Sequence, residues 1–455
     1  MKKIEVFDGI KLHTTIPEAQ YGGKTMCVMT GADSTGKPAQ IPFDESLLSR
    51  HIMFLGSIGT GKTNAISQVI SQLRDNLTND DVMIVFDSKG DFYNEFYRQG
   101  IDVVISNDSK AIGVDGKRDY WNLINEIERD SNMEDNIIEI AKTLFSEKLQ
   151  RTQQPFFPNA AKDLFSAVLF HCCRDDKLET NNADLREFFD GASIKGFKDL
   201  LSLHDDLKAM SSYIDEGASN QSLGVLSELQ QLIREIFIGN FKKEGTLSMR
   251  QLVRAKGGRI IFIEYDLGIG SMLSPIYRLL FDLAIKEALC RTKSEGNVYF
   301  VCDEFKLVPN LQHVDDAVNF GRSLGVKFLI GIQNVEQIYE AYAGKDGKGD
   351  GRLAKSLLSG FSTTVCFRVN DAESRKFIQD LYGKNRKKEI FSAAISTKGL
   401  VEQIRDSHVV EDWDIATMPI GQAIIGLAGQ EPFIFQFDEY VNEQNYPDFD
   451  KTIRV

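Results

Sequence analysis

Gly56-Ser57-Ile58-Gly59-Thr60-Gly61-Lys62-Thr63 is the stretch of sequence that decides the fold. It fits the pattern G-x-x-x-x-G-K-[ST], the phosphate-binding loop of nucleoside triphosphatases. Residues 51–55 before it predict a short buried strand, and residues 64–73 after it carry apolar side chains at helical spacing. A loop between a strand and a helix can aim several backbone N–H groups at one phosphate chain. The sequence therefore predicts a nucleotide-binding site.

The predicted ligands of this site are ATP and Mg²⁺. Lys62 would reach the β- and γ-phosphates, and the Thr63 hydroxyl would bind Mg²⁺. Asp87 follows the apolar run 82–86 and either contacts Mg²⁺ or its waters, or belongs to a plain strand-to-helix turn. The predicted nucleotide-binding residues are Gly56, Ser57, Ile58, Gly59, Thr60, Gly61, Lys62, Thr63, Asn64 and Asp87.

The composition is that of an ordinary globular protein. The 455 residues are long enough for two or three domains, and 42% of them are hydrophobic and 26% charged. A net charge of −13 counts against a broad DNA-binding surface but leaves room for a local basic channel. The six cysteines form no C-x-x-C pair, so we interpret them as reduced structural thiols of a cytoplasmic protein. We find no signal peptide and no apolar run of about eighteen residues.

The order of elements predicts an α/β fold: a P-loop NTPase core, with a mainly parallel sheet covered by helices on both faces and an inserted all-α domain. Residues 421–427 and 432–437 predict a hairpin that closes the sheet. We divide the chain into residues 1–130, the inserted all-α domain 131–256, and residues 257–455. The predicted strands are 25–30, 51–55, 82–86, 103–105, 259–264, 298–302, 326–332 and 363–369.

Polar residues follow several of these strands, and ligands of open α/β sheets lie at that edge. The apolar run 298–302 ends in Asp303-Glu304, the pattern of a Walker B site. Asp303 would hold Mg²⁺, and Glu304 would act as the general base toward the attacking water. Gln333, after the run 326–332, would sense the γ-phosphate or orient that water, or only hydrogen-bond at a strand end. We therefore assign catalytic roles to Glu304, Lys62 and Gln333.

Two further candidates are basic. Arg322, in the predicted helix 315–323, is the fourth catalytic candidate: it is either an arginine finger that enters a neighbouring subunit's site or a surface arginine. The cluster Lys384, Arg386, Lys387 and Lys388 predicts a loop after the helix 372–382. In a ring such a loop would line the pore and contact the phosphates of a nucleic acid. A solvated run of charges is the alternative.

Together these motifs resemble the conjugative coupling proteins of type IV secretion, within the FtsK–HerA superfamily. The resemblance covers roughly residues 25–440 and rests on Asp303-Glu304, the stretch 320–325, Gly331-Ile-Gln333, and the D-x-K-G-[DE] pattern at 87–91. It implies a RecA-like fold, a homohexameric ring, and ATP-driven movement of DNA through a central pore. The residues that would carry the family's nucleotide roles are Lys62, Thr63, Asp303, Glu304, Arg322 and Gln333.

Typical members of that family begin with membrane-spanning helices, and this chain has none. We therefore expect a protein of the cytoplasm, without direct membrane insertion, that either is recruited to the membrane by a partner or works beside a nuclease or effector. Its expected partners are further copies of itself, DNA, and either relaxase or secretion-channel proteins or a nuclease or effector. The leading hypothesis is a DNA translocase of the coupling type, moving DNA with or without attached protein. The alternatives are a HerA-like ATPase in DNA repair or phage defence, and an ATP-regulated assembly scaffold.

Overall fold

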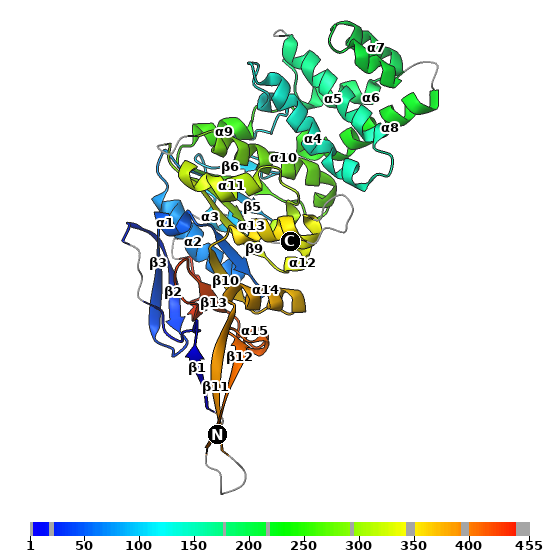
Figure 1. Ribbon diagram of the computed structural model, residues 1–455. Helices are drawn as coiled ribbons and strands as arrows, with labels where there is room; N and C mark the ends of the chain where they lie inside the picture. Colours follow the sequence, from blue (N-terminus) through cyan, green and yellow to red (C-terminus); the bar gives the residue numbers. More distant parts are fainter. Residues whose placement is uncertain are drawn as a thin grey trace.

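A large mixed sheet organises the molecule (Figure 1). The computed structural model describes residues 3–17, 22–175, 179–214, 219–291, 295–342, 351–392 and 400–442. Within these ranges the sheet has eleven strands, and those from β10 to β6 run parallel to one another. In spatial order these are β10 (Thr363–Phe367), β4 (Ile52–Leu55), β9 (Val326–Ile332), β8 (Val298–Cys302), β5 (Val82–Asp87), β7 (Arg259–Glu264) and β6 (Val103–Ile105). The predicted α/β fold is confirmed.

Antiparallel strands extend the sheet beyond β10. The hairpin predicted near the C-terminal end is present, because β13 pairs with both β10 and β14. Two strands from the N-terminal part then complete this edge. These strands are β13 (Gln422–Gly426), β14 (Phe433–Phe437), β2 (Thr25–Asp33) and β3 (Pro38–Asp44).

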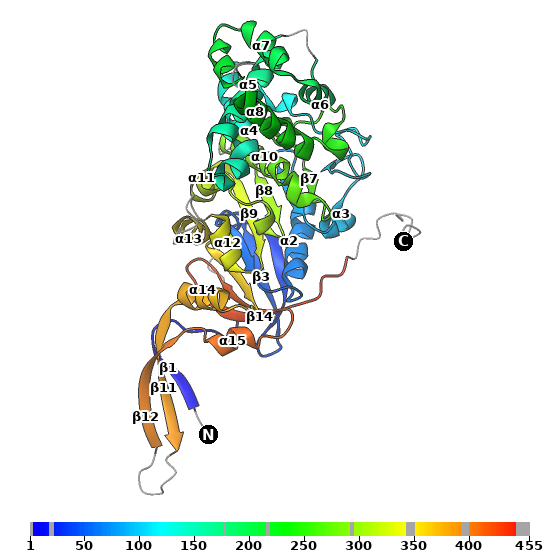
Figure 2. The same cartoon turned by 90° about the vertical axis from the view of Figure 1, so that its right-hand side faces the viewer.

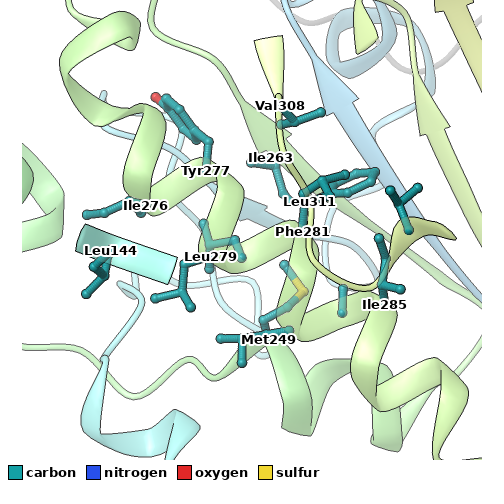
Figure 3. Packing of buried hydrophobic residues seen from close by; sticks show 14 of the residues in the cluster. Leu144, Met249, Ile263, Ile276, Tyr277, Leu279, Phe281, Ile285, Val308 and Leu311 are labelled. Carbon is teal, nitrogen blue, oxygen red and sulfur yellow. The ribbon is translucent and has the colours of Figure 1, made fainter. Parts of the chain in front are cut away.

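The parallel strands are buried on both faces. In β4, Ile52 and Phe54 join one hydrophobic core, whereas Met53 and Leu55 join the other, as the two-residue period of a strand requires. On the first face, α2 (Lys62–Asn76) buries apolar residues at helical spacing, as the sequence predicts. Figure 3 shows the second face. There Tyr277 and Phe281 of α10 (Gly270–Leu289) lie in the same core as residues of the sheet.

Shorter helices complete the covering of the sheet. They are α1 (Glu45–Leu48), α3 (Asp91–Phe96), α11 (Val314–Phe320), α12 (Val335–Ala341), α13 (Arg352–Ser359), α14 (Ala372–Tyr382) and α15 (Asp412–Ala416). The 3-10 turns are η1 (Ile124–Glu126), η2 (Lys208–Ile214), η3 (Gly239–Lys242), η4 (Phe305–Leu307) and η5 (Gly321–Leu324). Along the described ranges, no helix combines the length and apolar character needed to cross a membrane.

A layer of helices lies beyond one end of the sheet (Figures 1 and 2). Its members are α4 (Met133–Arg151), α5 (Phe156–Arg174), α6 (Asn182–Gly191), α7 (Ile194–Ser202) and α8 (Ser219–Ile236); α9 (Met249–Ala255) returns to the sheet. Between 131 and 256 the residues that the structure describes contain no strand. The division into three domains stays a prediction. α7 ends at Ser202, and the polar residues 204–206 lie between it and η2.

The prediction of a loop at Lys384–Lys388 is wrong, because these residues form a strand. β11 (Lys384–Ser392) lies between β1 (Lys3–Asp8) and β12 (Leu400–His408) in a separate sheet that projects from the body of the molecule (Figure 2). Acidic partners explain how a basic run becomes a strand. The Nζ of Lys388 lies 2.7 Å from Glu402 Oε1, and that of Lys387 lies 2.8 Å from Glu411 Oε1. A role of the cluster in nucleic-acid binding stays a prediction.

Candidate nucleotide-hydrolysis site

The phosphate-binding loop connects β4 to α2, as the sequence predicts. Gly59 has φ = 73° and Gly61 φ = 114°, a left-handed backbone that favours glycine. Gly61 is also the N-cap of α2. At Gly56 a Cβ atom would lie 2.7 Å from Cβ of Phe367, so the strand beside the loop leaves no room for a side chain. Backbone conformation thus favours glycine at positions 59 and 61, and close packing against Phe367 requires it at position 56.

Backbone contacts fix this loop to its neighbours. The N–H of Gly56 donates to the carbonyl of Ile332, and the N–H of Ser57 donates to the carbonyl of Arg368. On the other side of the loop, the N–H of Gly421 donates to the carbonyl of Thr60 at 3.0 Å. The loop is therefore attached to both adjacent strands and to the start of β13. Ile58, at its tip, is 75% exposed.

Lys62 is buried and curls back over the loop. Its ammonium donates to the carbonyls of Gly56 and Ser57, the latter at 3.1 Å. Burial lowers the pKa of Lys62 to about 8, an effect that nearby Glu304 opposes. Thr63 follows as the second residue of α2, half-buried, where its hydroxyl belongs to the first turn of the helix.

Asp303 directly follows β8, and its two carboxylate oxygens differ in their contacts. Its Oδ2 accepts from the hydroxyl of Ser88 at 2.8 Å, while its buried Oδ1 has no hydrogen-bond partner among the residues that the structure describes. Burial, reinforced by Asp87 and Glu304, raises the pKa of Asp303 to about 7. A buried carboxylate oxygen without a partner suits a hard divalent cation, so Asp303 fits a role as Mg²⁺ ligand.

Glu304 and Gln333 are in direct contact. The amide of Gln333 donates to Oε2 of Glu304, while Oε1 of Glu304 accepts no hydrogen bond from the part of the chain that the structure describes. The ammonium of Lys306 lies 3.7 Å from that Oε1. Burial raises the pKa of Glu304, and Lys306 is the main influence that opposes this rise. Glu304 and Gln333 are two of the residues to which the sequence gives catalytic roles, and they are in contact although they follow different strands.

Asp87 and Asn64 bind the protein's own backbone. The carboxylate of Asp87 accepts from the N–H groups of Gly90 and Tyr93, both at 2.8 Å, which supports the turn interpretation that the sequence left open. The side-chain amide of Asn64 donates to the carbonyl of Asp438 and accepts from the N–H of Tyr440. Contacts of these two side chains to a nucleotide stay predictions. The motif at 87–91 instead reaches the site through Ser88, which sequence analysis missed because a serine hydroxyl carries no distinctive pattern.

Arg322 lies at the opposite end of the sheet from its own phosphate-binding loop. It is exposed in η5, just before β9 begins, whereas the loop contacts Ile332 at the end of β9. The seven residues of β9 separate the two by about 20 Å. Arg322 therefore cannot reach Lys62 of the same chain, and a nucleotide role requires a second copy.

A phosphate-binding loop, a buried Asp-Glu pair and a glutamine in contact with that glutamate, on adjacent parallel strands, define a P-loop nucleoside triphosphatase. The family model described as the type IV secretion-system coupling protein DNA-binding domain matches residues 36–425. The chain belongs to this family. No curated protein sequence matches the chain.

Solved structures share the fold. The unbound bacterial conjugative coupling protein TrwBdeltaN70 is 17% identical, with a TM-score of 0.66 over 93% of this chain and 91% of that chain. TrwB in complex with the ATP analogue ADPNP is also 17% identical, with a TM-score of 0.68 over 89% of each chain. VirB4 of Thermoanaerobacter pseudethanolicus is 14% identical, with a TM-score of 0.55 over 94% of this chain and 100% of that chain.

Proposed function

We propose that this protein binds ATP with Mg²⁺ and hydrolyses it, and that hydrolysis moves DNA through a ring of identical copies. The observation that carries the proposal is the group formed by the buried Lys62, Asp303 and Glu304 and the half-buried Gln333, gathered at the carboxyl ends of β4, β8 and β9. TrwB, which shares the fold, has been solved with ADPNP and with ADP and Mg²⁺, which supports the choice of nucleotide and metal.

Each residue of the site has a separate role in the proposed reaction. Thr63 and Asp303 would hold Mg²⁺, which when bound neutralises phosphate charge. Lys62 would leave its loop carbonyls to contact the β- and γ-phosphates. The oxygen of a water attacks the γ-phosphorus, the bond to the ADP oxygen breaks, and Glu304 accepts the proton of that water. Gln333 holds Glu304 in place for this step.

The position of Arg322 supports a ring of copies. Because this arginine and the phosphate-binding loop lie at opposite ends of β9, a head-to-tail interface would place Arg322 of one copy at the loop of the next. A guanidinium there would counter the charge that develops on the phosphates. The match to a coupling-protein DNA-binding domain supports DNA as the moved substrate and the secretion machinery as the partner.

The steady-state rate of ATP hydrolysis, with and without DNA, tests the proposal. We expect Glu304→Gln to lower the rate at least about 100-fold while nucleotide binding persists. Glu340→Gln, on an exposed position of α12, is the matched control and should behave as the wild type. Wild-type turnover in Glu304→Gln would refute the hydrolysis mechanism. A wild-type rate that DNA leaves unchanged would refute DNA as the moved substrate.

A further inference from the structure

A cleft of about 720 Å³ separates the helical layer from the nucleotide-binding part of the molecule. Leu144 and Lys148 of α4 and Glu228 of α8 line one wall, and α10 with η4 lines the other. Figure 2 shows α4, α8 and α10 together above the sheet. The cleft wall includes Lys306, two residues after Glu304. The cleft and the hydrolysis site therefore share one short segment of chain.

Lys306 lies in the cleft wall and beside the hydrolysis site. Its side chain lines the cleft and is 33% exposed, while its ammonium lies 3.7 Å from Oε1 of Glu304. Glu304 itself is only 6% exposed, and Gln333 occupies its other oxygen. Each carboxylate oxygen of Glu304 thus has one polar side chain beside it, and one of these two side chains extends into the cleft.

Lys148, another lysine of the cleft wall, pairs with a different glutamate. Lys148 lies across the cleft, where its ammonium is 3.1 Å from Oε1 of Glu228 in the helical layer. Among the residues that the structure describes, Glu304 is the acidic group with which Lys306 pairs, at 3.7 Å. η4 begins directly after Glu304 and contains Lys306, so a displacement of this turn would move the ammonium relative to Glu304.

We propose that Lys306 is a positioning residue that fixes the carboxylate of Glu304 and transmits changes in the cleft to the hydrolysis site. The inference rests on the proposed function, because it requires Glu304 to act on water. A change in the packing of the helical layer would alter the cleft wall. The ammonium of Lys306 would then shift relative to Oε1 of Glu304 and change the position of that carboxylate. Helix movements would thereby regulate hydrolysis without touching the nucleotide.

Substitutions at Lys306 test the positioning role. We expect Lys306→Met to lower kcat for ATP about ten-fold or more with KM within about two-fold, because Lys306 orients the base and does not hold the nucleotide. Lys306→Arg should recover most of the rate. Lys148→Met, the matched control in the same cleft, should retain wild-type kcat. Unchanged kcat in Lys306→Met, or equal losses in Lys306→Met and Lys148→Met, would overturn the assignment.

A second measurement tests the connection to the cleft. Met272, 38% exposed in the cleft wall, is replaced by cysteine in a Cys290→Ser background, since Cys290 is exposed and the other cysteines are buried. A bulky maleimide attached at position 272 should lower kcat several-fold, and should have no further effect when Lys306→Met is also present. Equal inhibition with and without Lys306, or no inhibition in either background, would contradict transmission through Lys306. If Glu304→Gln abolishes hydrolysis but these variants do not respond, the inference fails while the proposed function stands.

Discussion

His51 should make folding stability depend on pH, and its contacts show why. The N–H of Phe328 donates to Nδ1 of His51 at 3.1 Å, so that nitrogen carries no proton. The proton must be on Nε2, which lies 3.1 Å from the carbonyl of Val318 and donates to it. The neutral ring thus joins β9 to the helix that leads to Arg322. A second proton would abolish the acceptor at Nδ1.

The size of the effect follows from the shift of the pKa. Burial, together with the positive charges of Lys327 and Arg322, lowers the pKa of His51 from 6.5 to about 4. The unfolded chain therefore binds more protons than the folded one between those values, and the free energy of unfolding falls as the pH falls through this window. The shift corresponds to about 3 kcal/mol of stability that is present above pH 6.5 and lost near pH 4.

Urea unfolding of the wild type and of His51→Asn, measured at several pH values from 7 to 4.5, isolates this contribution. The variant is less stable at pH 7 because contacts are lost, but its side chain does not titrate. We expect the stability gap between the two proteins to shrink by about 2–3 kcal/mol as the pH falls to 4.5. A gap that stays constant within about 0.5 kcal/mol would refute the assignment of a buried neutral histidine.

Further predictions concern the site and its supports. Ser88→Ala removes the hydroxyl that holds Asp303 and should raise the Mg²⁺ concentration for half-maximal turnover about ten-fold, measured by metal titration; an unchanged value would exclude this support. Gly61→Ala forces a side chain into φ = 114° and should abolish binding of a fluorescent ATP analogue; retained binding would contradict the loop geometry. Asn64→Ala removes two hydrogen bonds to residues 438–440 and should lower Tm by about 1–3 °C without changing ATP affinity; a lowered affinity would support the predicted nucleotide contact.

Local patterns in the sequence were enough to predict the nucleotide-binding loop and the ends of the parallel strands. The glycines around Lys62 and the acidic end of β8 are neighbours along the chain, so their spacing carries the signal. The contact between Ser88 and Asp303 joins residues 215 positions apart, and nothing in either segment specifies the other. The same holds for His51, whose partners Val318 and Phe328 become its neighbours only when the sheet is assembled.

The basic run at Lys384–Lys388 illustrates a different failure. Consecutive charges are typical of solvated loops, and the sequence around them gives no strand pattern. The acids that neutralise them, Glu402 and Glu411, lie farther along the chain and pair with them only in the folded state. In contrast, the helix 372–382 matches α14 residue for residue, because its apolar spacing is local. The loop prediction fails because these charges are paired only in the tertiary structure. The helix prediction succeeds because its signal lies within the helix itself.

Mixing two inactive variants tests the central claim, that each hydrolysis site is shared between copies. Lys62→Ala should bind no nucleotide productively, and Arg322→Ala should bind ATP without turnover. At a one-to-one ratio, a head-to-tail ring restores sites where an Arg322→Ala copy meets a Lys62→Ala neighbour, which predicts roughly a quarter of wild-type ATP hydrolysis. No recovery at any mixing ratio would contradict the shared site.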